Sequence, residues 1–332
     1  LGDVNNNYSS ESFDAFLSNR DVLADRMNER YENTNYPSGS YITESGLAGQ
    51  PFDPQNGAYS RNSPDVLIPA FLAAYTGRSA KSIETNPFLS IWSMMPNWRA
   101  NYDGLSRIPF IKDRFRTVRL THAYTSSFSI GSYDSYSTWI NMPGSDGTAL
   151  GYVKDVLSGN PIPSSAFNIG SVSLIENFSP LIGVNAELKN SLTPKVEYRK
   201  QRTMALNLTS LQLIETQSDE FVVGVGYVLK DFDVILRLKN NQQSRVKNDL
   251  KLNADISYKD IKSLLRKIDE NVTQPSSGTK TMSIKIMADY VFSSKMNIQL
   301  FYDYQANTPL ISTSYPTSAS NFGMSFKFML TR

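Results

Sequence analysis

The sequence predicts a mainly β protein, an antiparallel transmembrane β-barrel segment with long strands and hairpins, which carries an N-terminal helical and loop-rich insert. Three observations lead to this prediction. Helical spacing of apolar residues is confined to the first third of the 332-residue chain. From about residue 115 onward, apolar and polar residues alternate with the period of two that is typical of strands with two unlike faces. Tyrosine and phenylalanine gather near the ends of the apolar stripes, as in the aromatic girdles of membrane barrels.

Residues 1–114 are predicted to form the helix- and loop-rich segment. Residues 12–31, SFDAFLSNRDVLADRMNERY, show apolar residues at helical spacing, with Ser10 or Ser12 as a cap. A stretch rich in Gly, Pro and Asn follows and predicts loop over residues 33–62. A second helix is expected next, because Ser63 suits an N-cap, Pro64 the first helical position and Gly77 the exit.

Residues 115–332 are predicted to form about ten long strands of an outer-membrane sheet, with boundaries uncertain by a few residues. Tight links are expected at residues 190–193 and 293–295, and longer polar links at residues 271–279 and 306–320. Residues 134–167, rich in Gly, Ser and Pro, are expected to form one larger loop. Short turns at one end and longer loops at the other are typical of outer-membrane barrels.

The alternation assigns side chains of the last strands to two faces. We expect the polar set to face a water-filled lumen and the apolar set to face lipid. The expected lumen-facing residues are Lys251, Asp255, Lys285, Asp289, Asn297, Gln299, Asp303 and Lys327. The expected lipid-facing residues are Ile284, Ile286, Ile298, Leu300, Phe326 and Phe328.

A soluble antiparallel sheet protein, such as a sandwich or a solenoid, is the alternative that the residues leave open. Three features favour the barrel. Small and charged residues occupy the polar faces strand after strand, aromatic residues lie near the stripe ends, and the strands run for ten residues or more. Strands in soluble sheets usually have about five or six residues.

The composition argues against an enzyme. The chain has no cysteine and a single histidine, His122, so thiolate chemistry is excluded and a zinc site or a Ser-His-Asp triad is not expected. His122 lies on the apolar parity of its strand, which predicts a packed or interfacial side chain. The GVG at residues 224–226 lies within a strand and lacks the third glycine of a dinucleotide loop. We expect no catalytic residue, no metal and no cofactor.

Charge and hydropathy narrow the class further. The chain carries 33 basic and 31 acidic side chains, a balance that gives no basic footprint for nucleic acid. Its apolar residues do not form a run long enough to predict a membrane-spanning helix. The basic stretch KVEYRKQR, residues 195–202, is expected to be a solvated strand end, with contact to lipid headgroups or cargo as the alternative.

Several longer strings resemble one protein family. They include SPDVLIPAFLAAYTG and MPNWRANYDGLSRIPF in the first segment, ENFSPLIGVNAELKNSLTPKVEYRKQR in the middle, and LLRKIDENVTQPSSG and TSYPTSASNFG near the end. Together and in this order they resemble the C-terminal region of the SprA (Sov) family, giant outer-membrane translocons of the type 9 secretion system of Bacteroidetes.

The resemblance implies a function, a location and partners. Proteins of this family form a very wide barrel in the cell outer membrane through which folded cargo leaves the periplasm, and they are linked to gliding motility. The implied partners are a PorV-like barrel protein, a plug protein, cargo with a C-terminal signal domain, and outer-membrane lipid.

In such a barrel we expect residues 1–114 to lie in the lumen or at one mouth. Another outer-membrane transporter or porin barrel, and a soluble β-rich surface adhesin, remain the alternatives.

Overall fold

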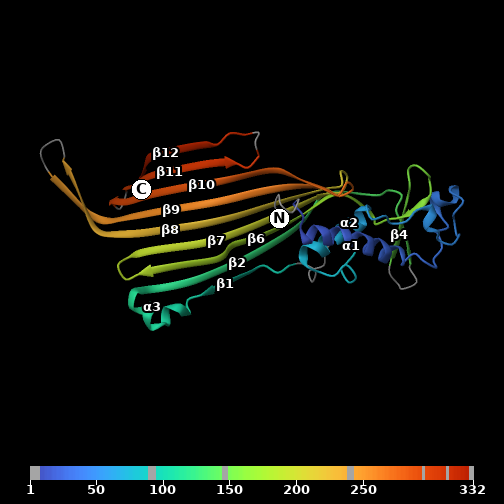
Figure 1. Cartoon of the computed structure of the whole chain (residues 1–332), viewed down its shortest axis with the longest axis horizontal. Coiled ribbons are helices and arrows are strands. Elements are labelled where there is room, and N and C mark those ends of the chain that lie inside the picture. The colour runs from blue at the N-terminus through green and yellow to red at the C-terminus, as the bar shows by residue number, and fades with distance from the viewer. Residues whose placement is uncertain are drawn as a thin grey trace, which may run out of the picture.

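The computed structural model describes residues 8–88, 95–143, 149–237, 243–293, 296–311 and 314–328. It is mostly β, as predicted, and is dominated by a nine-stranded antiparallel sheet (Figure 1). Lys295 of a predicted tight turn and Leu330 at the end of the predicted last strand lie outside these ranges.

The large sheet runs in the order β1-β2-β6-β7-β8-β9-β10-β11-β12, and every neighbouring pair is antiparallel. Its strands reach 26 residues in β8, far above the length usual in soluble sheets. Their bounds are β1 Trp98–Tyr102, β2 Phe115–Ser135, β6 Phe167–Leu188, β7 Leu192–Asn207, β8 Gln212–Arg237, β9 Gln243–Lys267, β10 Val272–Ser293, β11 Met296–Pro309 and β12 Thr317–Phe328.

Two helices follow the signals in the sequence closely. α1 (Glu11–Asn28) begins after Ser10, whose hydroxyl accepts a hydrogen bond from the Phe13 N–H. α2 (Pro64–Thr76) begins after Ser63 and ends at Gly77, whose φ of 70° is the left-handed conformation that favours glycine. The remaining helices are η2 Ser40–Glu44, η3 Pro54–Asn56, η5 Gly104–Arg107 and α3 Pro109–Arg114.

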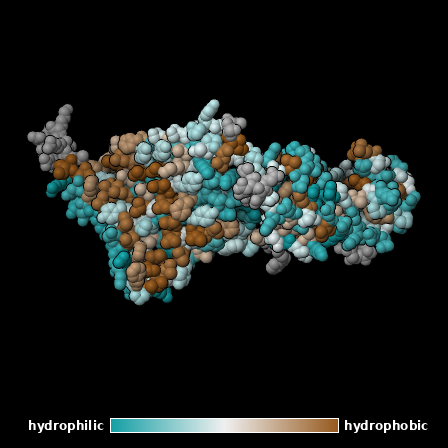
Figure 2. Space-filling view, viewed as in Figure 1, coloured by the Kyte–Doolittle hydropathy of each residue, from teal (hydrophilic) through white to brown (hydrophobic). Residues whose placement is uncertain are grey.

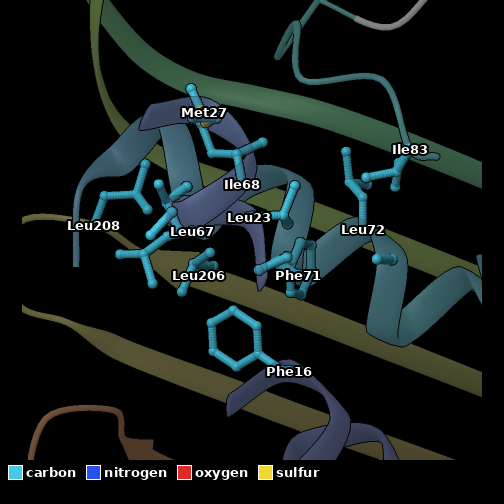
Figure 3. Close-up of a cluster of buried hydrophobic side chains, with 14 of the residues drawn as sticks. Phe16, Leu23, Met27, Leu67, Ile68, Phe71, Leu72, Ile83, Leu206 and Leu208 are labelled. Carbon is cyan, nitrogen blue, oxygen red and sulfur yellow. The ribbon is translucent and has the colours of Figure 1, made fainter. Parts of the chain in front are cut away.

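The helical unit, residues 8–88, packs on one end of the large sheet. Phe16 and Leu23 of α1 meet Phe71 of α2 above Leu206, at the end of β7, and Leu208 of the following turn (Figure 3). All five side chains are buried, so the helices and the strand ends share one hydrophobic core.

The prediction of one loop over residues 134–167 is wrong, because this stretch contains a small second sheet. Its three strands lie between β2 and β6 in the chain and pair antiparallel with one another. They are β3 Ile140–Pro143, β4 Ala149–Lys154 and β5 Pro161–Pro163. The Tyr31 hydroxyl donates to the Gly151 carbonyl at 2.9 Å, and Tyr152 is buried in the same core. Strands of three to six residues show too few alternations to be predicted from their sequence.

Two further expectations about the chain are wrong. The segment 1–114 contributes strand β1 to the large sheet, so the sheet begins before residue 115. Residues 272–279 lie in β10, because its ladder with β9 continues to Val272, and the turn between the two strands covers only residues 268–271.

Candidate functional site

The candidate functional site is the large sheet itself, whose register separates two chemically unlike faces. The six expected lipid-facing residues share one face: Ile298 lies opposite Phe326, and Leu300 opposite Ala288. The eight expected lumen-facing residues share the other face. Their assignment to lipid and to lumen stays a prediction.

An apolar band crosses the first face at one level. On β9 it comprises the alternate residues from Leu250 to Tyr258, and on β8 those from Phe221 to Leu229. Each strand segment thus spans nine residues, and a tilted transmembrane strand needs about 9–11 residues. The band continues over β10, β11 and β12 through Ile286, Leu300 and Phe326.

Side chains of the apolar band are accessible. Ile286 is 45 % exposed, Ile256 49 % and Phe326 50 %. In the same orientation as Figure 1, Figure 2 shows hydrophobic residues spread over the part of the sheet that lies away from the helical unit. An exposed apolar surface of this extent marks a surface that meets another apolar phase or a partner.

A charged row closes the band on the side of the helical unit. Lys200 lies opposite Asp219, Asp219 opposite Asp260, and Asp260 opposite Lys280. These four residues lie on the same face as the band. On each of these strands, the next residue of that face is therefore apolar or aromatic on one side of the row, where the band begins.

Aromatic side chains lie at this transition. The Tyr198 ring belongs to the level of Phe221 and Tyr258, and its hydroxyl donates to Asp219 of the charged row at 2.7 Å. On β1 and β2, Trp98 stacks on Tyr124 with ring centroids 4.3 Å apart. Rings with a polar edge suit a boundary between an apolar and an aqueous phase.

His122 belongs to the same aromatic region and has a structural role. Its Nδ1 lies 2.6 Å from the Leu181 carbonyl oxygen, and its ring packs 6.2 Å from that of Trp98. Among the described residues, no group of three or more His, Asp or Glu side chains could hold a metal ion.

The second face is polar, and its charges alternate in sign across neighbouring strands. Asp255 on β9 lies opposite Lys285 on β10, which lies opposite Asp303 on β11, and Lys251 lies opposite Asp289. Opposite charges across a strand pair stabilise the pairing by roughly 0.2–1 kcal/mol.

A shallow groove runs over this polar face across β1 to β9. Its floor includes Gly224 and Gly226, and a Cβ on either glycine would collide with a neighbouring side chain, Asp255 or Thr193. The GVG therefore provides room for polar side chains from the adjacent strands. Other groove residues are Asn101, Thr117, Arg119, Thr121, Asn185, Glu187, Lys195 and Asn253.

The basic stretch at residues 195–202 is the middle of β7, and it is divided between the two faces. On the polar face, Arg199 contacts Glu197 at 2.6 Å and Glu220 at 3.5 Å. On the opposite face, Arg202 binds Glu176 of β6. The expected solvated strand end is therefore wrong for these residues, because both arginines are held by carboxylates of neighbouring strands.

A buried ion pair joins the helical unit to the sheet. Arg266 of β9 is fully buried and lies 2.9 Å from the Glu215 carboxylate of β8. Tyr75 of α2 donates its hydroxyl to the same carboxylate, and Arg266 donates to the Tyr8 carbonyl at 2.9 Å. Burial, together with the Glu215 carboxylate, raises the pKa of the Tyr75 hydroxyl well above its ordinary value.

The position of this ion pair shows on which face of the large sheet the helical unit lies. Glu215 shares the parity of Val223 and Val225, and the β7–β8 ladder has no register shift between Gln212 and Tyr227. The helical unit therefore packs on the face of the apolar band. The polar face, which is the one expected to line a lumen, is thus the face opposite the helical unit, and the expectation that residues 1–114 lie in the lumen or at one mouth stays a prediction.

Comparisons with known proteins do not extend this picture. No family model matches the chain, and no curated protein sequence matches it. Within the described ranges, no helix is both long enough and apolar enough to cross a membrane.

Proposed function

We propose that the large sheet is part of the wall of an outer-membrane β-barrel, with the apolar band against lipid and the polar face toward an aqueous lumen. The observation that carries this proposal is the aligned, exposed band, nine residues tall on β8 and β9, which ends at the charged row. A soluble sheet would need a second apolar layer over this band.

The conduit that we propose is wide and serves protein export. The alternating charges Asp255, Lys285 and Asp303 give a lumen wall without a single dominant sign, so varied cargo would not adhere strongly. The strings that resemble the SprA (Sov) family favour the narrower proposal, a translocon of the type 9 secretion system with a PorV-like partner, a plug protein and a link to gliding motility.

The orientation follows from the lengths of the connections. At the end away from the helical unit, the connections β1–β2, β6–β7, β8–β9 and β10–β11 have twelve, three, five and two residues. At the end of the helical unit, the connections β2–β6, β7–β8, β9–β10 and β11–β12 have 31, four, four and seven residues. Beyond the charged row, β7 to β10 continue for seven or eight residues, roughly 23–26 Å along the strand, toward the helical unit. Since outer-membrane barrels have short periplasmic turns, we propose that the helical unit lies on the cell-surface side.

Paired single cysteines test the proposal, because the chain has no cysteine of its own. Gln299 and Leu300 are neighbours on opposite faces of β11. With cysteine at one position at a time in the complete protein, we expect a charged maleimide to label position 299 in membranes and to spare position 300. After transfer to detergent, a small uncharged maleimide should reach both positions.

The labelling also separates the alternatives. Equal labelling of both positions by the charged reagent in membranes would contradict the barrel. Labelling of both positions in a detergent-free soluble fraction would favour a surface adhesin. Selective labelling with conductance limited to small solutes would favour a porin.

A further inference from the structure

The twelve-residue connection between β1 and β2, at the end of the sheet away from the helical unit, is held firmly in place. Residues 103–114 link β1 to β2 and contain η5 and α3 (Figure 1). The Val118 N–H donates to the Ser106 hydroxyl oxygen at 2.8 Å, and the Lys189 N–H donates to the Arg114 carbonyl at 3.4 Å. The connection is therefore fastened to β2 and to the β6–β7 turn.

This connection exposes apolar side chains beside basic ones. Phe110 is 69 % exposed and Ile108 44 %. Arg107, Lys112 and Arg114 are exposed in the same segment, and the Arg114 guanidinium lies 5.3 Å from the centre of the Phe110 ring. In bulk water the exposed Phe110 ring and Ile108 side chain would gain no stabilisation from burial.

The same segment lies next to the apolar band. Arg114 directly precedes Phe115, and the buried Val118 and then Leu120 follow on the band face of β2, four and six positions after Arg114. Four residues of strand span roughly 13 Å, so the basic residues lie just outside the band, where long basic side chains extend from an apolar boundary toward water. Interfacial segments combine apolar residues with Lys and Arg in this way.

We propose that residues 104–114 form an interfacial anchor that binds anionic phospholipid headgroups at the short-turn end of the barrel. Ile108 and Phe110 insert at the boundary between headgroups and acyl chains, and Arg107, Lys112 and Arg114 bind headgroup phosphates. Asp113 is the acidic residue within this segment, so its basic residues are in excess. The anchor rests on the proposed membrane location of the band.

Spin labels on single cysteines test the anchor and the band separately. Pro109 is exposed between Ile108 and Phe110 and can be replaced without removing either side chain, and Ile286 reports on the band. The complete protein is reconstituted into nanodiscs of phosphatidylcholine alone or mixed with phosphatidylglycerol. Accessibility to oxygen and to a water-soluble nickel complex gives the depth of each label.

We expect the label at 286 to lie at acyl-chain depth in both lipids. The label at 109 should lie at the headgroup boundary and move deeper when phosphatidylglycerol is present. The triple variant Arg107→Gln, Lys112→Gln, Arg114→Gln should lose this lipid-dependent shift. The variant Ile108→Ser, Phe110→Ser should lose nickel protection at 109 in both lipids.

A control removes three basic residues of the helical unit, Arg61→Gln, Arg78→Gln and Lys81→Gln, and should keep the shift at 109. Free access of nickel to position 109 in both lipids, with position 286 protected, would overturn the anchor and leave the band intact. Free access at 286 would overturn the proposed barrel and the anchor with it.

Discussion

Arg266 is among the largest fully buried side chains of the described residues. Its guanidinium is fully buried, paired with Glu215, donates to Thr273 at 3.0 Å, and lies 4.6 Å from the centre of the Phe13 ring. A buried pair of this kind contributes to stability only while both partners are present, because desolvation of each charge offsets much of the attraction.

We therefore expect Arg266→Leu to be severe, since it leaves the Glu215 carboxylate buried without its cation. The expected loss is about 3–5 kcal/mol in the free energy of unfolding of the helical unit. Protease susceptibility of α1 measured against urea concentration would report it. The double variant Arg266→Leu, Glu215→Leu should recover part of the loss, and a double variant worse than the single one would contradict this account.

Asp65, near the start of α2, behaves differently because no salt bridge to its carboxyl group occurs within the ranges that the structure describes. The side chain is 7 % exposed and accepts a hydrogen bond from the Ser165 N–H at 3.0 Å. Burial raises the pKa of this carboxyl group above its ordinary value of 3.8. The neutral form is therefore favoured by folding.

The sign of the pH dependence follows. Stability from this group is fully present below pH 3.8 and is lost as the pH rises through the raised folded pKa. We expect Asp65→Asn, which keeps an acceptor for Ser165, to be more stable than the natural chain at neutral pH. That advantage should vanish in acid. Urea midpoints measured across this pH range would check it, and a variant that is weaker at neutral pH would show that the carboxylate is stabilised.

At the scale of elements, the long strands have separate zones. On β8, alternate residues of the same face change from core under the helical unit, through the charged row, to the apolar band. Leu213, Asp219 and Val223 represent these three zones. Each zone thus faces a different environment although the backbone ladder is continuous.

This zoning predicts unequal effects for substitutions on one strand. In β10, Ile286→Arg places a charge in the middle of the apolar band and should cost about 2–4 kcal/mol if that band meets lipid. The amount of folded protein recovered in the membrane fraction would fall. Asp289→Asn, on the polar face of the same strand, should leave it unchanged, and equal effects of the two substitutions would argue against the proposed faces.

The zoning also explains which elements the sequence predicts. Within the apolar band the alternation is complete, so the faces of Ile298 and Gln299 follow from spacing alone. The first residues of β10, Thr273 and Gln274, lie beyond the band, where polar residues occur on both parities and resemble a loop. Helix α2 was predictable because Ser63, Pro64 and Gly77 signal its ends locally.

At the scale of the whole molecule, contacts between distant segments escape prediction from one sequence. The Arg266–Glu215 pair depends on the β8–β9 register, which places Leu213 opposite Arg266. The side of the sheet that carries the helical unit depends on the same register. Helix signals in residues 1–114 are local and contain no information on which face the helices cover.

The packing of α1 on β9 has a consequence for the order of folding. The Ser10 hydroxyl oxygen accepts from an Arg266 side chain that lies 256 positions later in the chain. Ser10 and Phe13, which contact Arg266, therefore lack this partner until β9 has been synthesised and delivered to the same compartment. Contacts so distant in sequence form slowly. We expect the chain to depend on chaperones that shield the helical unit throughout transit, so residues 8–88 would reach their final state only after the much later strand β9 has arrived.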